Sequence, residues 1–370
     1  MSFIITILAA LLVFSAVIAI HEFGHFTVAK LCGIQVNEFS IGMGPVLWKK
    51  NHKGTQYSLR ALPVGGFVAL EGEESPESQQ AEAAHTVQEQ PAPETEAPVQ
   101  PIGVPLNEAP VWQRALVMVA GAVMNFVLGF VVLVVLIAAQ NEPITSKTIY
   151  AIQDGALCGQ TGLQAGDKVL AVNGRRCFVA NDILYELVRT RSYSADFTVL
   201  RDGQKVQLPG VQFDTWQDEK GETHMSIGFS VYGLEKTPGN VLREAGNSVL
   251  YYGRIVFTSL VDLVRGRESI NNLSGPVGIV SAIGQAASYG WQDLLELLAL
   301  ITINLGIFNL LPFPALDGGK VVFLVIEGVT GHAVPEKLQS VLTLATFGLL
   351  FGLMLFATYN DILRLITGTV

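Results

Sequence analysis

The stretch that decides the fold is AIHEFGHFTVAK, residues 19–30, in which two histidines, a glutamate and a lysine follow an apolar run without a charged side chain. Ionisable groups that continue an apolar helix are costly at membrane depth, so they normally have partners and a function. Half of the 370 residues are hydrophobic and only 15% are charged, which is typical of a membrane protein rather than of a soluble enzyme.

The spacing of HEFGH predicts a zinc site on one face of a helix. Positions i and i+4 lie about one turn apart, so His21 and His25 would direct ring nitrogens at one ion, with Glu22 beside its bound water. Zinc lowers the pKa of bound water to about 7, and the glutamate would take that proton and pass it to the leaving amine. The alternative is a chance match at a helix end, which the position directly after an apolar run disfavours.

The chain contains four runs without Asp, Glu, Lys or Arg, at residues 1–20, 115–141, 297–316 and 338–360. A helix needs about 20 apolar residues to cross the hydrocarbon core of a bilayer. We therefore predict a polytopic α-helical membrane protein whose four transmembrane helices lie within residues 1–32, 111–141, 291–332 and 333–370. A cleaved signal peptide is disfavoured because the first run lacks a basic start and an A-x-A-like site. In the last run Gly348 and Gly352 form a GxxxG pair, which predicts helix packing.

A catalytic zinc needs a third protein ligand and an open coordination position. Asp317 ends the third charge-free run, within NLLPFPALDGGK at residues 309–320. Pro312 and Pro314 predict a break in this helix, and backbone freed at membrane depth is tolerated only if protein buries it or it lines a wet cavity. Taken alone, an aspartate before two glycines would be a turn or cap residue. Together with the two histidines, zinc ligation by Asp317 is favoured.

The loop after the first helix divides into two parts. Residues 33–72 contain β-rich runs broken by glycines, and VNEFSI, TQYSLRAL and GFVAL predict short strands in a small membrane-associated sheet. Residues 73–110 hold most of the nine glutamates that lie between Ala61 and Gln113, a stretch without Lys or Arg. Such a composition cannot bury enough apolar surface to offset the entropy of ordering, so we predict an acidic disordered linker there.

Residues 142–235 have the character of a soluble domain inserted between membrane helices. GLQAGDKVLAVNG at residues 162–174, the helix-like NDILYELVRT and two later strand-like runs are similar to a PDZ domain. A PDZ domain binds an extended peptide as an added strand, so a peptide ligand is expected. A generic β-rich domain with an NG turn is the alternative. Cys158 and Cys177 are compatible with either a disulfide or two unpaired buried thiols.

Residues 236–290 connect this domain to the third membrane helix. Within them, residues 238–264 mix apolar positions with charges that recur too often for a fifth membrane span. This pattern predicts an amphipathic helix at the membrane interface, followed by a connector.

These motifs together resemble the site-2 protease family of intramembrane zinc metalloproteases. The resemblance is carried by HEFGH, a GMGP-containing β segment, the PDZ-like segment, LSGPVGI at residues 273–279 and NLLPFPALDGG. It extends over almost the whole chain and is strongest to the bacterial RseP type, which has two PDZ domains where we find one. The acidic linker matches least.

The resemblance implies roles for the matching residues. Zinc would be held by His21, His25 and Asp317. Glu22 would activate water, and Asn309 would contact the substrate backbone or help to polarise the scissile carbonyl. An alternative for Asn309 is an amide that satisfies helix carbonyls exposed by the prolines. Asn304 is a further candidate substrate-binding residue of the same kind.

The same resemblance implies a multi-pass protein of the cell (inner or plasma) membrane, with the active site near the cytosolic side and the PDZ-like domain outside the cytoplasm. Charge supports this orientation weakly, because Lys30 and Arg114 flank the first loop but Lys147 closely follows the second helix. Transmembrane protein substrates and the lipid bilayer are the expected partners. A nucleic-acid partner is not expected.

Three classes of function follow. The first is an intramembrane zinc endopeptidase that cleaves transmembrane segments of single-span proteins, such as anti-sigma factors or remnant signal peptides, in regulated intramembrane proteolysis. The second is a catalytically inactive membrane-bound PDZ adaptor with a structural metal site, against which Glu22 argues because a structural site needs no base. The third, a transporter, would show duplicated hydrophobic halves, which are not evident in this sequence.

Overall fold

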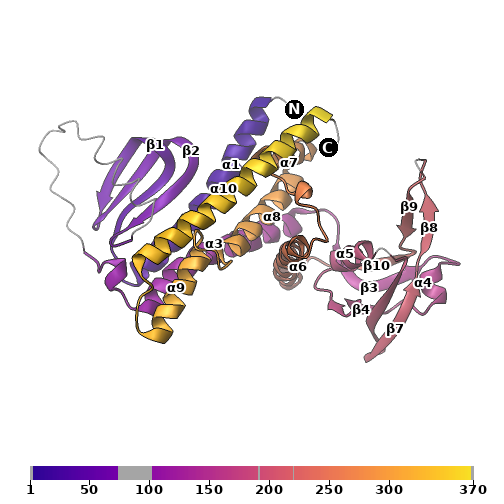
Figure 1. Cartoon of the computed structure of the whole chain (residues 1–370). Helices are drawn as coiled ribbons and strands as arrows, with labels where there is room; N and C mark the ends of the chain where they lie inside the picture. Colours follow the sequence, from indigo (N-terminus) through magenta and orange to yellow (C-terminus); the bar gives the residue numbers. More distant parts are fainter. Residues whose placement is uncertain (1–2, 74–101, 191, 220, 368–370) are drawn as a thin grey trace, which may run out of the picture. The chain divides into compact units, whose positions relative to one another are not determined.

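The computed structural model describes residues 3–73, 102–190, 192–219 and 221–367 (Figure 1). The chain divides into two compact units, one formed by residues 1–132 and 256–370 and the other by residues 133–255. The first unit contains most of the long apolar helices and a two-stranded sheet, and the second contains a six-stranded sheet.

Four helices of the described chain are long and apolar enough to cross a membrane: α1 (Phe3–Leu31), α3 (Val111–Ala139), α8 (Trp291–Asn309) and α10 (Glu336–Thr367). They confirm the four membrane helices predicted from the charge-free runs. Because α1 continues past its apolar run to Leu31, the ionisable residues of HEFGH lie within a membrane helix and not in the loop that follows it.

The third membrane helix is interrupted at its prolines. A segment that contains Pro312 and Pro314 separates the end of α8 from α9 (Asp317–Thr330). A Cβ on Gly319 would lie 2.2 Å from the Phe313 carbonyl oxygen, so the absence of a side chain lets α9 begin directly against the break. The first residue of α9 is thereby held close to the end of α8.

Two ion pairs fix the position of α9. Lys320 Nζ lies 2.8 Å from Glu73 Oε1, which ties the end of the β segment to α9 one turn after Asp317. Arg114 of α3 pairs with Glu327 farther along α9. Both pairs are largely shielded from solvent, so they hold α9 at two points along its length.

The β segment consists of two antiparallel strands, β1 (Val36–His52) and β2 (Thr55–Leu70). Both strands bend, so that each contributes two arms to one small sheet. The first arm of β1 lies between the two arms of β2, because Phe39 pairs with both Tyr57 and Val68. The arms at the two edges of this sheet are residues 46–52 and 66–70.

The bends of these strands differ from the short strands that the sequence predicts. Gly42 and Gly65 have φ angles of 87° and 80°, a region that side-chain-bearing residues rarely adopt. Glycines at these positions let the chain turn sharply and shift register without leaving the ladder. Runs that looked separate in sequence are therefore continuous strands.

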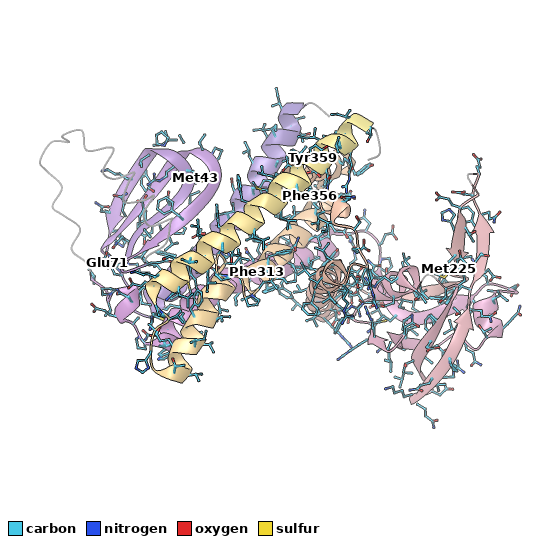
Figure 2. All side chains as sticks on the ribbon, in the orientation of Figure 1. Met43, Glu71, Met225, Phe313, Phe356 and Tyr359 are labelled. Carbon is cyan, nitrogen blue, oxygen red and sulfur yellow. The ribbon has the colours of Figure 1, made fainter. Side chains whose placement is uncertain are left out.

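The bend of the sheet reaches membrane depth. Ser15, in the middle of the span Ile4–Leu31, donates a hydrogen bond to the Pro63 carbonyl of β2. Large apolar side chains are exposed around the bend, among them Met43 (Figure 2). The others are Ile41, Leu47, Trp48, Leu59 and Leu62. A bilayer would cover these apolar side chains. In water they would stay exposed, which is unfavourable for an apolar patch of this size.

A buried ion pair holds the arms of the sheet together. Arg60 Nη2 lies 2.8 Å from Glu38 Oε1, and Ser58 Oγ donates to the same oxygen at 2.5 Å. Arg60 also donates to the Gly44 carbonyl at 3.1 Å and stacks its guanidinium over the Phe67 ring. The buried charges are thus compensated by hydrogen bonds, and these contacts join different arms of the sheet.

The end of the predicted acidic linker is structured. Residues 74–101 lie outside the described residues, but Val104 pairs with Ile34 in a parallel bridge. Leu106 is 6% exposed and belongs to a core cluster with the end of α1 and the start of α3. The prediction of disorder is therefore wrong for residues 102–110. Their apolar side chains pack into a core, which the composition of the linker as a whole does not indicate.

The LSGPVGI motif forms the start of α7 (Pro276–Tyr289), where a backbone N–H of the motif donates a hydrogen bond to a carboxylate of α10. The Gly278 N–H donates to Asp361 Oδ2 at 2.7 Å, and Asp361 is only 4% exposed. A negative charge at a helix N-terminus interacts favourably with the helix dipole. A Cβ on Gly275 would lie 2.7 Å from the Thr358 nitrogen, so this glycine permits the close contact.

The GxxxG pair of α10 faces no other segment of the described chain. A Cβ built on Gly348 or Gly352 meets no atom within 4 Å. Large side chains of the same helix are exposed as well, including Phe356 and Tyr359 (Figure 2). The pair therefore packs against no helix of the described residues, and packing against a helix of another chain stays a prediction.

The second unit is built on an antiparallel sheet with strand order β10-β3-β4-β6-β7, and β5 pairs with β4 outside this path. Its strands are β3 (Ile144–Ile152), β4 (Lys168–Val172), β5 (Arg175–Arg176), β6 (Ser194–Arg201), β7 (Gln204–Gln212) and β10 (Phe229–Leu234). Two short helices, α4 (Leu157–Gln160) and α5 (Asn181–Arg189), and a hairpin of β8 (Asp214–Gln217) and β9 (Thr223–Ser226) complete it. Ile149, Leu163 and Phe197 lie at the centre of its core.

A helix, α6 (Pro238–Val264), forms over the stretch that the sequence predicts to be amphipathic, and it is not among the candidate membrane spans. Within the second unit, Arg254 of this helix pairs with Asp182 of α5, whose side chain is fully buried. Asp182 also accepts the Val179 N–H at 2.9 Å, so the charge is compensated on two sides. The short helix η2 (Ile270–Asn272) then leads to α7.

All three cysteines are free thiols, which decides between the two alternatives that the sequence left open. Cys158 and Cys177 are each 1% exposed, and burial raises the pKa of the Cys177 thiol to about 12. We expect both to resist iodoacetamide at pH 8 in the folded protein, because burial raises the pKa of each thiol and keeps the reactive thiolate scarce. Mass spectrometry should detect their alkylation after denaturation without reductant; unreacted cysteines would instead indicate a disulfide.

Candidate metal centre

His21 and His25 lie one turn apart on α1, with their rings in contact. The two Nε2 atoms are 3.2 Å apart, and the ring centroids are 4.7 Å apart in an edge-to-face arrangement. Each residue is 8% exposed. The helical spacing thus brings two nitrogen donors to one buried point.

Asp317, the first residue of α9, meets this pair from the opposite end of the chain. Its Oδ2 atom lies 3.2 Å from His21 Nε2 and 3.4 Å from His25 Nε2. The carboxylate reaches the histidines because the break after α8 places the start of α9 beside α1. One carboxylate oxygen and two imidazole nitrogens therefore converge, and we call these three side chains the metal cluster.

The metal cluster has the spacing of ligands around one tetrahedral zinc ion. Zinc–nitrogen and zinc–oxygen bonds of about 2.0–2.2 Å at tetrahedral angles separate neighbouring ligand atoms by about 3.3–3.6 Å. The observed separations are 3.2, 3.2 and 3.4 Å. Asp317 Oδ2 is buried and has no partner with hydrogen-bond geometry among the described residues, as expected of an atom reserved for an ion. Three protein ligands leave one coordination position open.

Groups behind the two imidazoles orient them. His25 Nδ1 lies 2.7 Å from the Val117 carbonyl oxygen, so it donates its proton there and leaves the lone pair on Nε2. His21 Nδ1 lies 3.2 Å from the Asn125 amide nitrogen. A half-turn of that amide presents its oxygen to the ring, which is the orientation that matches a proton on Nδ1 and a metal ion on Nε2.

Asn125 and Thr302 are site residues that sequence reasoning missed. Both are fully buried, and the Thr302 hydroxyl on α8 donates to the Asn125 carbonyl on α3 at 3.1 Å. A signal was present, because Asn125 is the one strongly polar side chain between residues 115 and 139. Polar groups inside a membrane helix normally have a partner, so an isolated asparagine there indicates a polar contact.

Gly121 allows α3 to approach the metal cluster. A Cβ at this position would lie 2.4 Å from His25 Nε2 and 2.6 Å from His21 Cε1. On the facing helix, a Cβ on Gly24 would lie 2.4 Å from the Ala120 carbonyl oxygen. Paired small residues let two membrane helices pack closely, and here the close packing makes room for the imidazoles.

The other predicted site residues lie at different distances from the metal cluster. Glu22 is half-buried on α1 and interacts electrostatically with His25. The Asn309 amide nitrogen, at the end of α8, lies 3.4 Å from His21 Nε2. Asn304 lies farther up α8, where its buried Oδ1 has no hydrogen-bond partner in the described part of the chain. The structure therefore brings Asn309 to the cluster but not Asn304.

Replacing Asn125 with leucine should weaken zinc binding by about 10- to 100-fold, because the His21 ring loses the group that sets its orientation. The measurement is the zinc retained by purified protein during dialysis against a graded chelator. Asn304→Leu removes an amide from another membrane helix without touching the cluster, so it should retain zinc like the wild type. Unchanged zinc retention in Asn125→Leu would mean that other contacts hold the His21 ring.

Comparison with known proteins identifies the family. The chain matches the family described as Peptidase family M50 over residues 9–353. It is 29% identical over 422 aligned residues to the regulator of sigma-W protease RasP of Bacillus subtilis (strain 168), covering 98% of this chain and 99% of that protein. It is 33% identical over 359 residues to the putative zinc metalloprotease CPE1693 of Clostridium perfringens (strain 13 / Type A), covering 96% and 98%. The chain therefore belongs to peptidase family M50, the family of site-2 zinc metalloproteases.

Proposed function

We propose that this zinc metalloprotease cleaves the transmembrane segments of single-span membrane proteins in regulated intramembrane proteolysis. The observation that carries the proposal is the depth of the metal cluster. His21 and His25 lie in a candidate membrane span, and Asp317 follows the break at the end of another. The name of the Bacillus subtilis relative, regulator of sigma-W protease, supports anti-sigma factors as a substrate class, beside remnant signal peptides.

In this proposal each residue of the site has a separate task. The ligands of zinc are His21, His25 and Asp317. A bound zinc ion would polarise the scissile carbonyl and lower the pKa of a water molecule. Glu22 takes up the proton of the attacking water and returns it to the leaving amine, since it lies on the same helical turn as the ligands. The Asn309 amide donates to the substrate backbone at the edge of the cluster.

The substrate must be unwound before it can be cleaved, because a helix shields its own peptide bonds. The β segment offers a way to hold an unwound strand. Within the described ranges, its outer arm at residues 66–70 pairs on one side. The sheet packs against α1 through Phe26 and Phe39, whose ring centroids are 4.9 Å apart. Unpaired backbone groups on an edge strand bind an added strand, so we propose that the sheet clamps substrate by strand addition.

A proline scan of the outer arm tests the clamp. Backbone N–H groups of an edge strand point alternately toward its neighbour and outward. Proline at successive positions from 66 to 69 should therefore abolish cleavage at the outward positions while the sheet and bound zinc persist. Cleavage that survives proline at every position would refute strand addition at this edge.

We propose that residues 142–235, within the second unit, form a single PDZ-like domain that takes an extended peptide. Among the residues that the structure describes, β10 is an end strand of the sheet and pairs with β3 alone. The other side of β10 is thus available for a peptide strand. We place this unit outside the cytoplasm and the metal cluster near the cytosolic side. Cysteine labelling of Asp202→Cys, a turn position, in intact cells and in inverted vesicles tests that orientation.

Reconstitution tests the proposed function. Purified protein in liposomes, given a single-span substrate, should cut inside the apolar segment, at a position that mass spectrometry of the fragments identifies. 1,10-Phenanthroline should stop the reaction and added zinc should restore it. Intact substrate in the presence of bound zinc would favour the alternative, an inactive PDZ adaptor with a structural metal site.

A further inference from the structure

Two adjoining hollows on the second unit are lined by basic side chains. One has a volume of about 220 Å³ and lies between β3, β4 and the start of α6, and the other has a volume of about 650 Å³ and lies along β4. They share Lys147, Lys168 and Arg243 in their walls. The two hollows therefore adjoin in one basic surface, which no residue of the metal cluster lines and which reaches Leu234 at the end of β10.

The charges around these hollows are almost all positive. The basic residues, which we call the cationic basin, are Lys147, Lys168, Arg176, Lys205 and Arg243. The acidic residue among the lining side chains is Glu244, and burial raises the pKa of this carboxyl above its usual range. The chain as a whole carries a net charge of −9, so the basin is a local excess of positive charge.

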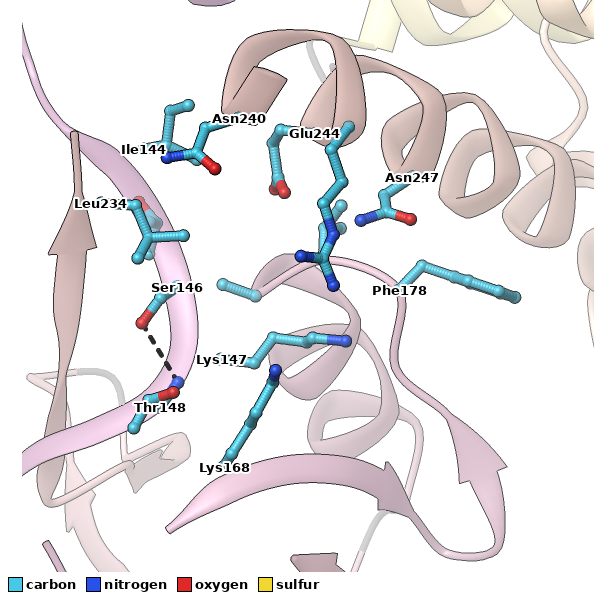
Figure 3. A pocket seen from close by; sticks show the side chains of 14 residues that line it. Ile144, Ser146, Lys147, Thr148, Lys168, Phe178, Leu234, Asn240, Glu244 and Asn247 are labelled. Atoms are coloured by element: carbon cyan, nitrogen blue, oxygen red, sulfur yellow. Dashed lines mark hydrogen bonds between the residues drawn. The ribbon is translucent and has the colours of Figure 1, made fainter. Parts of the chain in front are cut away.

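The five cations share this space with one carboxylate, Glu244, which interacts electrostatically with Lys147 and Arg243. Lys147 of β3 and Lys168 of β4 direct their side chains into the same space (Figure 3). Lys147 donates to the Cys177 carbonyl at 2.6 Å, and burial lowers the pKa of its amine. Lys168 and Arg243 form no ion pair within the ranges that the structure describes. Like charges at close range repel, and an anion seated among them would remove that repulsion.

The basin lies close to a membrane exit. β3 begins at Ile144, five residues after the candidate span α3 ends at Ala139. The Lys236 ammonium contacts the Gln140 carbonyl, which ties the chain before α6 to this same exit. An extended chain covers at most about 3.5 Å per residue, so Lys147 lies within about 28 Å of the end of α3.

We propose that the cationic basin binds the phosphate group of an anionic phospholipid headgroup. Lysine and arginine are the side chains that bind phosphate, and basic residues beside a membrane helix are attracted to anionic lipids. The larger hollow exceeds the size of a phosphate ion and has room for a headgroup. Because chain length keeps Lys147 within about 28 Å of the end of α3, the headgroups of a bilayer that α3 crosses are anions within reach of the basin.

The test is lipid binding by the full-length protein in detergent, followed by native mass spectrometry. The probes are dioctanoyl phosphatidylglycerol, dioctanoyl phosphatidylcholine, inorganic phosphate and a polyglutamate peptide. The double variant Lys168→Gln/Arg243→Gln removes two cations that form no ion pair with any described residue, so the fold should persist. We expect it to bind phosphatidylglycerol at least tenfold more weakly than the wild type, with phosphatidylcholine binding unchanged.

A matched control removes the same charge elsewhere. Lys49→Gln/Lys50→Gln neutralises two exposed lysines of β1 and should bind phosphatidylglycerol like the wild type. A second variant at the rim, Arg176→Gln/Lys205→Gln, should weaken binding less than the first and covers the case in which the first fails to fold. Wild-type affinity in both basin variants would overturn the proposal. Equal or tighter binding of inorganic phosphate would assign the site to a free anion, and tighter binding of polyglutamate to an acidic peptide; either result overturns a lipid site.

Discussion

Glutamine in place of Glu22 should lower the cleavage rate by about 10²- to 10⁴-fold while the protein keeps its zinc. Glutamine matches the size of the side chain but cannot accept a proton from water near neutral pH. The carboxylate of Glu22 is not one of the three ligand atoms of the metal cluster, so the metal keeps its full set of protein ligands. A time course of substrate cleavage and elemental analysis of the same sample measure the two quantities.

A matched variant separates the base from a general effect of charge. Glu142→Gln neutralises an exposed carboxylate between α3 and β3 and should change neither cleavage nor zinc content. Wild-type cleavage by Glu22→Gln would mean that another group accepts the proton. Loss of zinc from Glu22→Gln would instead identify this glutamate as a ligand.

Alanine in place of Gly121 should reduce zinc affinity by at least about 10- to 100-fold and abolish most cleavage, although it adds one methyl group. The added Cβ would lie 2.4 Å from His25 Nε2, a separation that real Cβ atoms essentially never show. The ring cannot easily retreat, because its other nitrogen is bonded to the Val117 carbonyl. Either α3 moves away from α1 or the imidazoles leave the positions that bind the ion.

Gly348→Ala is the control for this prediction. It makes the same substitution in another membrane helix, at a position where a Cβ meets nothing within 4 Å. This variant should match the wild type in zinc content, cleavage and thermal stability. If Gly121→Ala also retained zinc, α3 would have to yield more readily than its packing against Gly24 indicates.

The parts of the site that sequence reasoning predicts are those whose chemistry is unusual for their location. Two histidines and a glutamate directly after an apolar run stand out, because charge is costly there and the i, i+4 spacing specifies one helical face. Asp317 stands out for a related reason, since it follows two prolines that interrupt a membrane helix. Patterns of this kind are local in sequence, even though the contact between His21 and Asp317 is not.

The features of the site and fold that the sequence does not predict depend on which helices pack against each other. Gly121 and Gly348 are both glycines in apolar runs, yet one lies against the imidazoles and the other faces open space. Nothing near either residue in sequence distinguishes them. Composition predicts that residues 102–110 belong to the linker, whereas contacts with the end of α1 hold them in an ordered structure. Helix partners and distant cores are set by the whole fold, so single-sequence patterns do not specify them.

The ion pair between Glu73 and Lys320 makes the β segment a brace for α9, which carries Asp317 one turn away. Strain applied to the sheet is therefore transmitted to the carboxylate, and a defect in the sheet has two distinguishable outcomes. A sheet variant that cleaves poorly but retains its zinc would have lost substrate binding. A sheet variant that loses zinc would have weakened the contact between Glu73 and Lys320. Under the proposed clamp, a substrate docked along the sheet would act on the same ion pair, and this would link substrate capture to the position of Asp317.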